Sequence, residues 1–167
     1  MDGKRLYVLA GFDDATERAL AGIQERILEA GFTGRQTMGI PMHATLGSFP
    51  SAPEEEARLC ELLREAAADT RTFPVAFNHI GVFGGGEVLF AAPDTDGALL
   101  SLKERFGREF GWTPHATLLI DDRERVLAAL PIALKEFRSF AGRVAYLHLY
   151  EFFPTRHILS VGLGEAV

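Results

Sequence analysis

The sequence predicts an α+β fold made of two lobes that face each other. Strand-like runs of β-branched and aromatic residues alternate with amphipathic helical patterns along the chain. The tetrapeptide His-Ala-Thr-Leu occurs twice, at residues 43–46 and 115–118. Each copy lies in a strand-like segment that follows a helical pattern and precedes a helix and a hairpin. We interpret this order as an internal duplication within a single domain spanning residues 1–167, with pseudo-repeats at roughly 14–92 and 94–164.

The first half of the chain carries four strand patterns and two helical patterns. Asp14-Ala-Thr-Glu17 and Ser51-Ala-Pro-Glu54 fit the capping box, in which two side chains satisfy free backbone N–H groups at a helix start. Gly84-Gly-Gly86 separates two strand patterns and predicts a hairpin. The expected elements are a strand at 5–10, a helix at 14–30, a strand at 42–49, a helix from 51 through 66, and strands at 73–82 and 87–92.

The second half repeats this order with a helix, a strand, a helix and a hairpin. Leu99, Leu102 and Phe106 share one helical face. Asp121-Asp-Arg-Glu124 is expected to cap the next helix, and Pro131 to interrupt it, because proline lacks the N–H that an interior helical position donates. The remaining elements are strands at 114–120, 143–152 and 157–162, the last two joined by a turn at Pro154-Thr155.

Composition limits the class of function. A chain of 167 residues with 47% hydrophobic content can bury one sizeable core. Its net charge of −6 argues against a surface that wraps long nucleic acid, since such binding needs Lys and Arg to neutralise phosphates. No apolar run approaches the roughly 20 residues that span a bilayer. We therefore expect a cytoplasmic monomer with no membrane contact, acting on a small substrate or only on an RNA end.

The two His-Ala-Thr-Leu segments carry the candidate catalytic groups. Alternate residues of a strand point to one face, so His43 projects with Thr45, and His115 with Thr117. Gly47 is expected to leave open space on the same face. A cleft between the two strands would then hold two imidazoles and two hydroxyls.

These groups suit the in-line cleavage of a phosphodiester. The reaction needs a base on the attacking oxygen and an acid on the leaving oxygen, and two histidines can supply both near neutral pH. The threonine hydroxyls can donate to the non-bridging oxygens, where charge builds up in the transition state. Neither a metal nor another cofactor is required. The expected pH profile is bell-shaped, because one imidazole must be protonated and the other neutral.

Other interpretations stay open at this point. A single His-x-Thr on a strand is more often a hydrogen-bonded structural histidine than a catalytic one, and only the pair in equivalent positions favours catalysis. One alternative is a nucleotide-binding module that has the cleft without turnover. A second is RNA ligation through a 2′-5′ bond, which the acidic charge of the chain disfavours.

The same segments resemble a known family. The strand at 5–10, Pro41-Met-His-Ala-Thr-Leu46, Pro114-His-Ala-Thr-Leu118 and the strand at 144–151 are similar to segments of the two-histidine (2H) phosphoesterases. That family includes the LigT-like RNA 2′,3′-cyclic phosphodiesterases, often labelled 2′-5′ RNA ligases. The resemblance covers nearly the whole chain. It implies a bilobal α+β fold with two antiparallel sheets facing a central cleft, helices on the outside, and a metal-independent reaction.

The resemblance also implies roles for particular residues. His43 and His115, with Thr45 and Thr117, would form the catalytic set, with His43 as the acid and His115 as the base. Departures from the family pattern leave the substrate open. Phe152 stands where many relatives have a serine, and Arg156 where many have a tyrosine. Arg156 can serve as an additional phosphate ligand, although a surface arginine is the simpler interpretation.

Four further side chains are candidates for lining the cleft. His148 alternates with Tyr150 on a late strand and is a candidate for the cleft floor, although a structural role in the sheet is the simpler interpretation. Phe49 and Trp112 lie close to the motifs in sequence and can stack on a nucleobase, although packing is the simpler interpretation for both. A zinc site is not expected, because no carboxylate or third histidine accompanies either motif.

Overall fold

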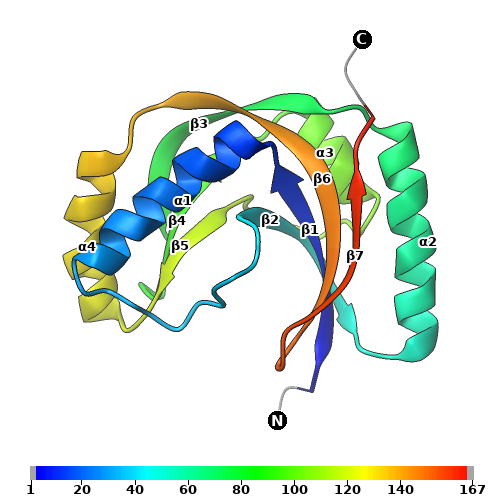
Figure 1. Cartoon of the computed structure of the whole chain (residues 1–167), viewed down its shortest axis with the longest axis horizontal. Coiled ribbons are helices and arrows are strands. Elements are labelled where there is room, and N and C mark those ends of the chain that lie inside the picture. The colour runs from blue at the N-terminus through cyan, green and yellow to red at the C-terminus, as the bar shows by residue number, and fades with distance from the viewer. Residues whose placement is uncertain (1–2, 165–167) are drawn as a thin grey trace.

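The computed structural model describes residues 3–164 and has an α+β architecture (Figure 1). Within that range the helices are α1 (Asp14–Glu29), α2 (Pro53–Asp69), α3 (Gly97–Glu104) and α4 (Arg123–Glu136). The strands are β1 (Arg5–Phe12), β2 (His43–Pro50), β3 (Phe73–Val82), β4 (Val88–Pro93), β5 (Ala116–Ile120), β6 (Phe140–Phe152) and β7 (Arg156–Gly162). The predicted fold class is confirmed. None of the described helices is long and apolar enough to cross a membrane.

The strands form one antiparallel sheet in the order β1-β2-β5-β4-β3-β6-β7. β1 also pairs with β6, which closes the first six strands of this order into a ring. The ring has one weak junction, because β2 and β5 pair only through Ala44 and Ala116. On the other side, β6 pairs first with β3 and then with β1. The two sheets predicted from the sequence are therefore two continuous parts of one sheet, β1-β2-β6-β7 and β3-β4-β5.

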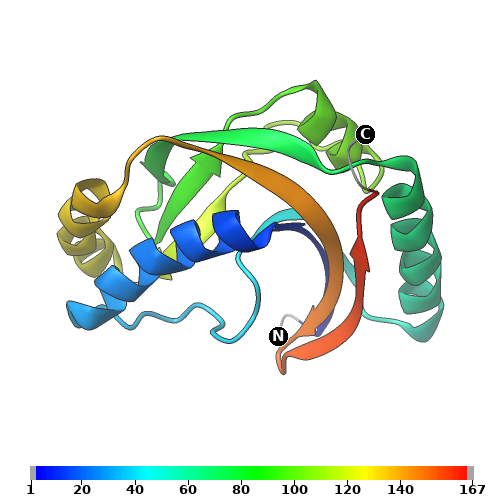
Figure 2. The ribbon, with the colours of Figure 1, turned by 45° about the horizontal axis from the view of Figure 1, so that its top comes forward.

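Each part of the sheet combines strands from both halves of the chain. The β3–β4 hairpin follows β2 in sequence but pairs with β5, and the β6–β7 hairpin follows β5 but pairs with β1. The helices show the same exchange, since α1 packs against α4 and β5, whereas α2 packs on β6 and β7 (Figure 1, Figure 2). The two lobes therefore do not coincide with the two pseudo-repeats.

The hydrophobic core fills the space between the sheet and the helices. The inward faces of β1, β2 and β5 contribute Leu6, Leu46 and Leu118, which are fully buried. The helices contribute residues such as Leu20 of α1 and Leu63 of α2, at the spacing of one helical face. Burying each leucine stabilises the fold by about 1.5–3 kcal/mol. Because the leucines of β2 and β5 point into this core, the polar residues of the motifs lie on the opposite face of these strands.

Three helix starts differ from the prediction, namely the two capping boxes and the cap expected at residues 121–124. α1 is capped one residue earlier, by Asp13, whose carboxylate accepts a hydrogen bond from the N–H of Thr16 at 3.0 Å. α2 has no side-chain cap, because Ser51 donates instead to the carboxylate of Glu151 at 2.5 Å. α4 also lacks a side-chain cap. A tertiary partner that is distant in the sequence competes for Ser51, and a local pattern cannot reveal that partner.

The predicted interruption at Pro131 is wrong, since α4 continues through it to Glu136. Proline cannot donate to the carbonyl four residues earlier, which belongs to Leu127. Leu127 is 47% exposed, so its carbonyl lies on the solvent side of the helix. Ala129 and Ala133, on either side of the proline, are fully buried and anchor both segments of the helix.

A β-bulge ends the face that His43 and Thr45 share on β2. The pairing with β1 changes register between Thr45 and Gly47, so Gly47 turns toward the core. The prediction that Gly47 opens space beside the motif is therefore wrong. A Cβ atom built on Gly47 would lie 2.8 Å from the ring of Phe49, and the glycine is required for this close packing.

Candidate active site

The junction between β2 and β5 places the two motifs side by side. Their single pair joins the alanines at the centre of both motifs. Because the strands are antiparallel, the residues on either side of this pair lie opposite each other. His43 therefore lies beside Thr117, and Thr45 beside His115. The structure brings the four predicted groups together in a crossed arrangement, in which each histidine neighbours the threonine of the other motif.

Both histidines are oriented by the same hydrogen bond. The Nδ1 atom of His43 lies 2.8 Å from the carbonyl oxygen of Pro41, and that of His115 lies 2.9 Å from the carbonyl oxygen of Thr113. A carbonyl oxygen can only accept, so each Nδ1 carries the proton and donates. The Nε2 atom of each ring is then free to take or give a proton. Glu17 of α1 supports the first ring, because its carboxylate accepts from the N–H of Met42 at 2.9 Å.

The surroundings of the two rings differ. Burial lowers the pKa of His43, the hydrogen bond to Pro41 opposes this change, and repulsion from His115 adds to it. His43 is therefore held in the neutral form at neutral pH. His115 is half-buried and packs against a pair of aromatic rings that contact each other, with centroid distances of 4.8 Å to Phe83 and 5.4 Å to Phe90. Aromatic rings can attract an imidazolium through cation–π interaction.

A third histidine lies next to this pair. His148 of β6 is buried beside Gly11 of β1, where a Cβ atom would collide with the His148 ring. Its Nδ1 lies 2.6 Å from the hydroxyl of Ser160, which is also 2.7 Å from the Nε2 of His157. Burial, with repulsion from His43 and His157, lowers the pKa of His148 to about 4. His148 is therefore neutral over the physiological range, and it lines a hollow next to the pocket rather than the pocket itself.

A pocket of about 240 Å³ opens beside the first motif. His43, Thr45 and Thr117 lie on its wall, and His115 lies outside it on the side of Phe83. Its other lining residues are Tyr7, Gln24, Gln36, Thr37, Met38, Gly39, Ile40, Pro41, Met42, Ile120, Phe152 and Phe153. Some of this second set, such as Tyr7 and Ile120, lie on predicted strands, but no sequence pattern marked them as pocket residues, and residues 36–40 come from a loop without a periodic pattern.

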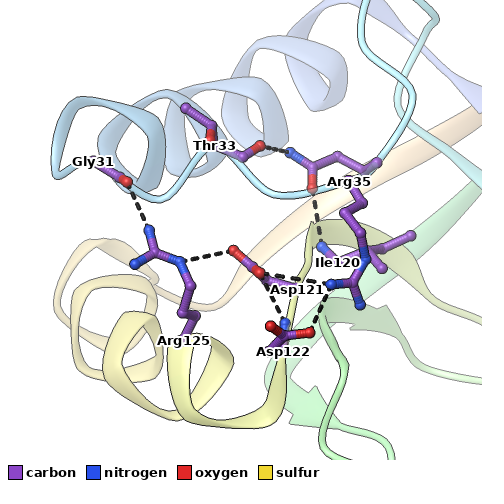
Figure 3. Close-up of polar contacts among 8 residues, drawn as sticks. Gly31, Thr33, Arg35, Ile120, Asp121, Asp122 and Arg125 are labelled. Atoms are coloured by element: carbon purple, nitrogen blue, oxygen red, sulfur yellow. Dashed lines mark hydrogen bonds and ion pairs between the residues drawn. The ribbon is translucent and has the colours of Figure 1, made fainter.

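The loop between α1 and β2 forms one wall of this pocket and is fixed to β5. The N–H of Arg35 donates to the carbonyl of Ile120 at 2.6 Å, and the side-chain oxygen of Gln36 accepts from the N–H of Ile120 at 3.0 Å. The guanidinium of Arg35 pairs with Asp122 at 2.8 Å, at the start of α4 (Figure 3). The carbonyl and N–H groups of Ile120 therefore have hydrogen-bond partners, although β2 pairs with β5 only at Ala116. They tie the segment that precedes His43 to the strand of the second motif.

Two neighbouring features hold this loop in place. Gly34 has a φ of +67°, and a Cβ atom there would lie 2.7 Å from the carbonyl oxygen of Ile120, so the close approach to β5 requires glycine. Arg125 of α4 bridges Asp121, at 3.0 Å, and the carbonyl of Gly31, at 2.9 Å (Figure 3). The hydrogen bonds from Asp122 and Arg125 lower the pKa of Asp121.

Arg156 does not reach the two histidines. Its guanidinium pairs with Glu56 of α2 at 2.6 Å and with Glu151 at 3.3 Å, on the side of the sheet that α2 covers. Residues of α2 and β6 around it, and not the motif residues, line the adjoining hollow. The alternative role of Arg156 as a phosphate ligand is therefore not supported, because Glu151, its cross-strand neighbour, and Glu56 of α2 bind the guanidinium.

Phe49 and Trp112 also lie away from the pocket. The ring of Phe49 packs against the main core, with Arg58 5.7 Å from its centroid. The indole N–H of Trp112 donates to the carbonyl of Thr45 at 3.1 Å, from the side opposite the histidines. Neither ring is placed to stack on a base in the pocket, and the simpler interpretation, packing, fits both. Tyr150 is buried, and its ring stacks on that of Phe152, with the centroids 5.8 Å apart. It therefore contacts a residue of the pocket wall without lining the pocket.

Comparisons with known proteins agree with this geometry. A family model described as the 2′-5′ RNA ligase superfamily matches residues 12–152. The chain belongs to this superfamily. It is also a 2H phosphoesterase by its family membership, and the predicted family is confirmed. No curated protein sequence matches the chain significantly.

Several solved structures share the fold of this superfamily member. E. coli LigT complexed with ATP is 21% identical, with 97% of this chain and 98% of that chain covered and a TM-score of 0.64. TT0787 of Thermus thermophilus is 16% identical, with 97% and 100% covered and a TM-score of 0.68. A protein described as a phosphoesterase is 17% identical, with 98% and 100% covered and a TM-score of 0.62. At these identities the likeness concerns the fold.

Proposed function

We propose that the chain is a metal-independent phosphodiesterase that hydrolyses a cyclic or linear phosphodiester of a nucleotide or an RNA end. A nucleoside 2′,3′-cyclic phosphate is the first substrate to test. The observation that carries the proposal is the matched pair of histidines. Each donates from Nδ1 to the carbonyl two residues earlier, and each lies beside the threonine of the other motif. Two Nε2 atoms with opposite proton states are what in-line hydrolysis needs.

The unequal surroundings of the histidines suggest which is the base. Neutral His43 takes a proton from water at Nε2 as the water oxygen attacks phosphorus. Protonated His115 gives its Nε2 proton to the leaving ribose oxygen as the P–O bond breaks. One water is consumed, and a phosphomonoester and a free hydroxyl are formed. This assignment is the reverse of the one that the family resemblance implies, and it follows from the burial of His43.

The threonines are placed to bind the phosphoryl oxygens. Thr45 and Thr117 both line the pocket, on opposite strands of the junction. Hydroxyl donors on two sides of one phosphate would stabilise the charge on the non-bridging oxygens, which increases in the transition state. A donor of this kind typically contributes about 10²–10³ in kcat where it acts as an oxyanion contact.

Structures of a relative support a small nucleotide as the ligand. E. coli LigT is described as complexed with phosphate, with ATP, with 3′-AMP and with NADP+. A pocket of about 240 Å³ beside the motif is near the lower end of the size range of small-molecule sites, which favours a small ligand. Within residues 3–164, no three His, Cys, Asp or Glu side chains are arranged to hold a metal ion.

The test is hydrolysis of adenosine 2′,3′-cyclic phosphate, followed by phosphorus NMR, with and without EDTA. We expect turnover that EDTA leaves unchanged, and a loss of at least about 10² in kcat for His43→Ala and for His115→Ala. Full activity of either variant, or activity restored only by added metal, would overturn the proposal. Tight binding of 3′-AMP without any product would favour the binding module, and joining of RNA ends would favour the ligase.

A further inference from the structure

Phe153 has an unusual conformation for an aromatic residue. It lies in the turn between β6 and β7, and its φ of +67° places it in the left-handed region, which a bulky side chain rarely adopts. Its side chain is 77% exposed and stands at the wall of the pocket beside His43. Such conformations persist where the surrounding structure enforces them, and they are concentrated at binding sites. A large exposed ring held in this way beside the proposed site needs a functional explanation.

The pocket that Phe153 borders contains almost no charge. Among its lining residues within the described part of the chain, His43 is the only ionisable group that can become a cation near neutral pH. Aromatic and aliphatic side chains dominate its walls, with Tyr7 and Phe152 in an edge-to-face contact at 5.1 Å. Met38, on the loop opposite, is 52% exposed at the same pocket. Apolar walls on both sides suit a flat, uncharged ring.

The amides of the pocket provide limited polar contact. Gln24 donates to the carbonyl of Leu118 at 3.0 Å, and Gln36 donates to the carbonyl of Thr33 at 2.8 Å. The carbonyl oxygen of Gln36 accepts from Ile120. Part of the hydrogen-bonding capacity of these amides is therefore used within the protein. They can contact the edge of a ring, but they cannot neutralise a phosphate.

The arginines nearest the pocket in sequence are bound elsewhere. Arg35 pairs with Asp122 at 2.8 Å, and Arg156 pairs with Glu56 at 2.6 Å. Arg5, two residues before Tyr7, donates to the hydroxyl of Ser48 at 2.7 Å. Binding of additional phosphate groups requires cationic or N–H donors at the right distance. Among the described lining residues, no side chain other than that of His43 can therefore supply a positive charge for a second phosphate.

We propose that this pocket selects substrates in which one phosphodiester is attached to a single uncharged aromatic ring system, and that Phe153 is a specificity-determining residue that packs on that ring. The inference rests on the proposed function and narrows its substrate class to the cyclic phosphates of single nucleosides. Additional phosphates, whether a 5′-diphosphate or the backbone of an oligonucleotide, contribute nothing to recognition. The phosphate lies between the threonines, and the base lies between Phe153 and Tyr7.

The test compares four substrates: adenosine 2′,3′-cyclic phosphate, the 2,3-cyclic phosphate of methyl riboside, the 5′-diphosphate of the adenosine compound, and a diadenylate with a 2′,3′-cyclic end. Removing the base should lower kcat/KM by about 10-fold, the lower part of the range for stacking of a base on an aromatic ring. Adding phosphates should change kcat/KM by less than about 3-fold and should not introduce the steep salt dependence of phosphate contacts.

Phe153→Gly tests the residue without disturbing the turn. Glycine adopts a positive φ readily, so this variant removes the ring and keeps the backbone conformation. We expect KM for the adenosine compound to rise about 10-fold, with kcat retained, and a much smaller change for the methyl riboside. The matched control is Phe110→Ala, because Phe110 is fully exposed and lies away from the pocket, and it should behave as wild type.

The outcomes separate the two proposals. If wild type hydrolyses the methyl riboside as well as the adenosine compound, or prefers the diadenylate by more than about 10-fold, the inference fails and the phosphodiesterase stands. An equal effect of Phe153→Gly on both substrates also overturns it. If no cyclic phosphate is hydrolysed, the proposed function fails. Calorimetry with 3′-AMP and with ribose 3-phosphate then tests the inference alone, and equal affinity for the two overturns it.

Discussion

The first and second motifs have identical sequences but different surroundings. His43 begins a strand, borders a pocket, and has a pKa that burial lowers. His115 lies just before β5, outside that pocket, and contacts the rings of Phe83 and Phe90. The hydrogen bond that orients each ring is the same in both. Identical tetrapeptides therefore orient the two imidazoles in the same way, whereas the rest of the fold gives the two rings different surroundings.

This difference has a chemical consequence. A general base must be neutral and a general acid protonated at the working pH. Two histidines in identical environments would have the same pKa, so neither would be preferred as the base or as the acid. In the mechanism that we propose, burial of His43 favours the neutral form that a base needs.

The largest effect should come from replacing each histidine in turn and changing the leaving group. A nitrophenolate leaves without a proton, whereas a ribose oxygen needs one. With the cyclic nucleotide, both alanine variants should lose about 10²–10⁴ in kcat. With a bis(nitrophenyl) phosphate, His115→Ala should recover most of its rate, because the acid is no longer needed, and His43→Ala should not. Initial rates on both substrates measure the difference.

Thermal unfolding of both variants provides the control, because a folding defect would lower the rate on every substrate alike. Rescue of His43→Ala in place of His115→Ala would reverse the assignment and restore the roles that the family resemblance implies. Equal rescue of both variants would mean that the two surroundings do not separate the roles.

A second effect should appear in the pH dependence of stability around His148. Its pKa is about 4 in the folded protein, against about 6.5 for an unperturbed histidine. As the pH falls from about 6.5 to 4, the unfolded chain takes up a proton at this position that the folded chain does not, so the folded state is destabilised. The loss attributable to His148 between pH 7 and pH 4 should be about 3 kcal/mol. His148→Gln keeps a polar group beside Ser160 and removes this titration.

Urea unfolding of wild type and His148→Gln at several pH values measures this effect. The free energy of unfolding should fall less steeply with acid in the variant, while the change caused by His43, whose pKa is lowered in the same direction, remains in both. Parallel curves for the two proteins would show that His148 is not held neutral by its surroundings.

Other groups that approach His148 are Gly11 of β1, Tyr146 and Tyr150 of its own strand, and Glu17 and Asp14 across the adjoining hollow.

Local patterns in the sequence predict most of this fold. The expected strand at 73–82 has the observed bounds, and the other elements agree within a few residues. Periodicity and turn residues act over short distances, so they are readable from one chain. The strands with which the two hairpins pair cannot be predicted from local patterns. These pairings, of β6 with β1 and of β4 with β5, join residues more than 20 positions apart in the sequence. Ser51 illustrates the same limit, since its partner is Glu151.

The site was predictable to the extent that it repeats. The repeated tetrapeptide His-Ala-Thr-Leu identifies His43, Thr45, His115 and Thr117, and the structure places all four at the junction of β2 and β5. For Arg156 the sequence left two interpretations open, and its ion pair with Glu56 of α2, 100 residues away, cannot be inferred from a local pattern. The ring of Phe153 has no sequence signal, since its importance arises from a backbone conformation and an adjacent pocket.

The smallest effect should come from the link between the two motifs. Gln36 accepts a hydrogen bond from Ile120, the last residue of β5, and also lines the pocket. Gln36→Ala leaves that N–H without its partner, which should cost about 1 kcal/mol of stability. Because the loop before His43 is fixed to the strand after His115 through this contact, the spacing of the two motifs should loosen as well. Kcat should therefore fall by a few-fold, far less than when a histidine is removed.

The matched control for this link is Arg35→Ala on the same loop. Arg35 forms an exposed ion pair with Asp122 that water and salt screen, so its side chain should matter less than that of Gln36. Urea unfolding and kcat on the cyclic nucleotide distinguish the two variants. A Gln36→Ala protein as stable and as active as Arg35→Ala would mean that the loop does not set the spacing, and that the short β2–β5 junction alone aligns the two histidines.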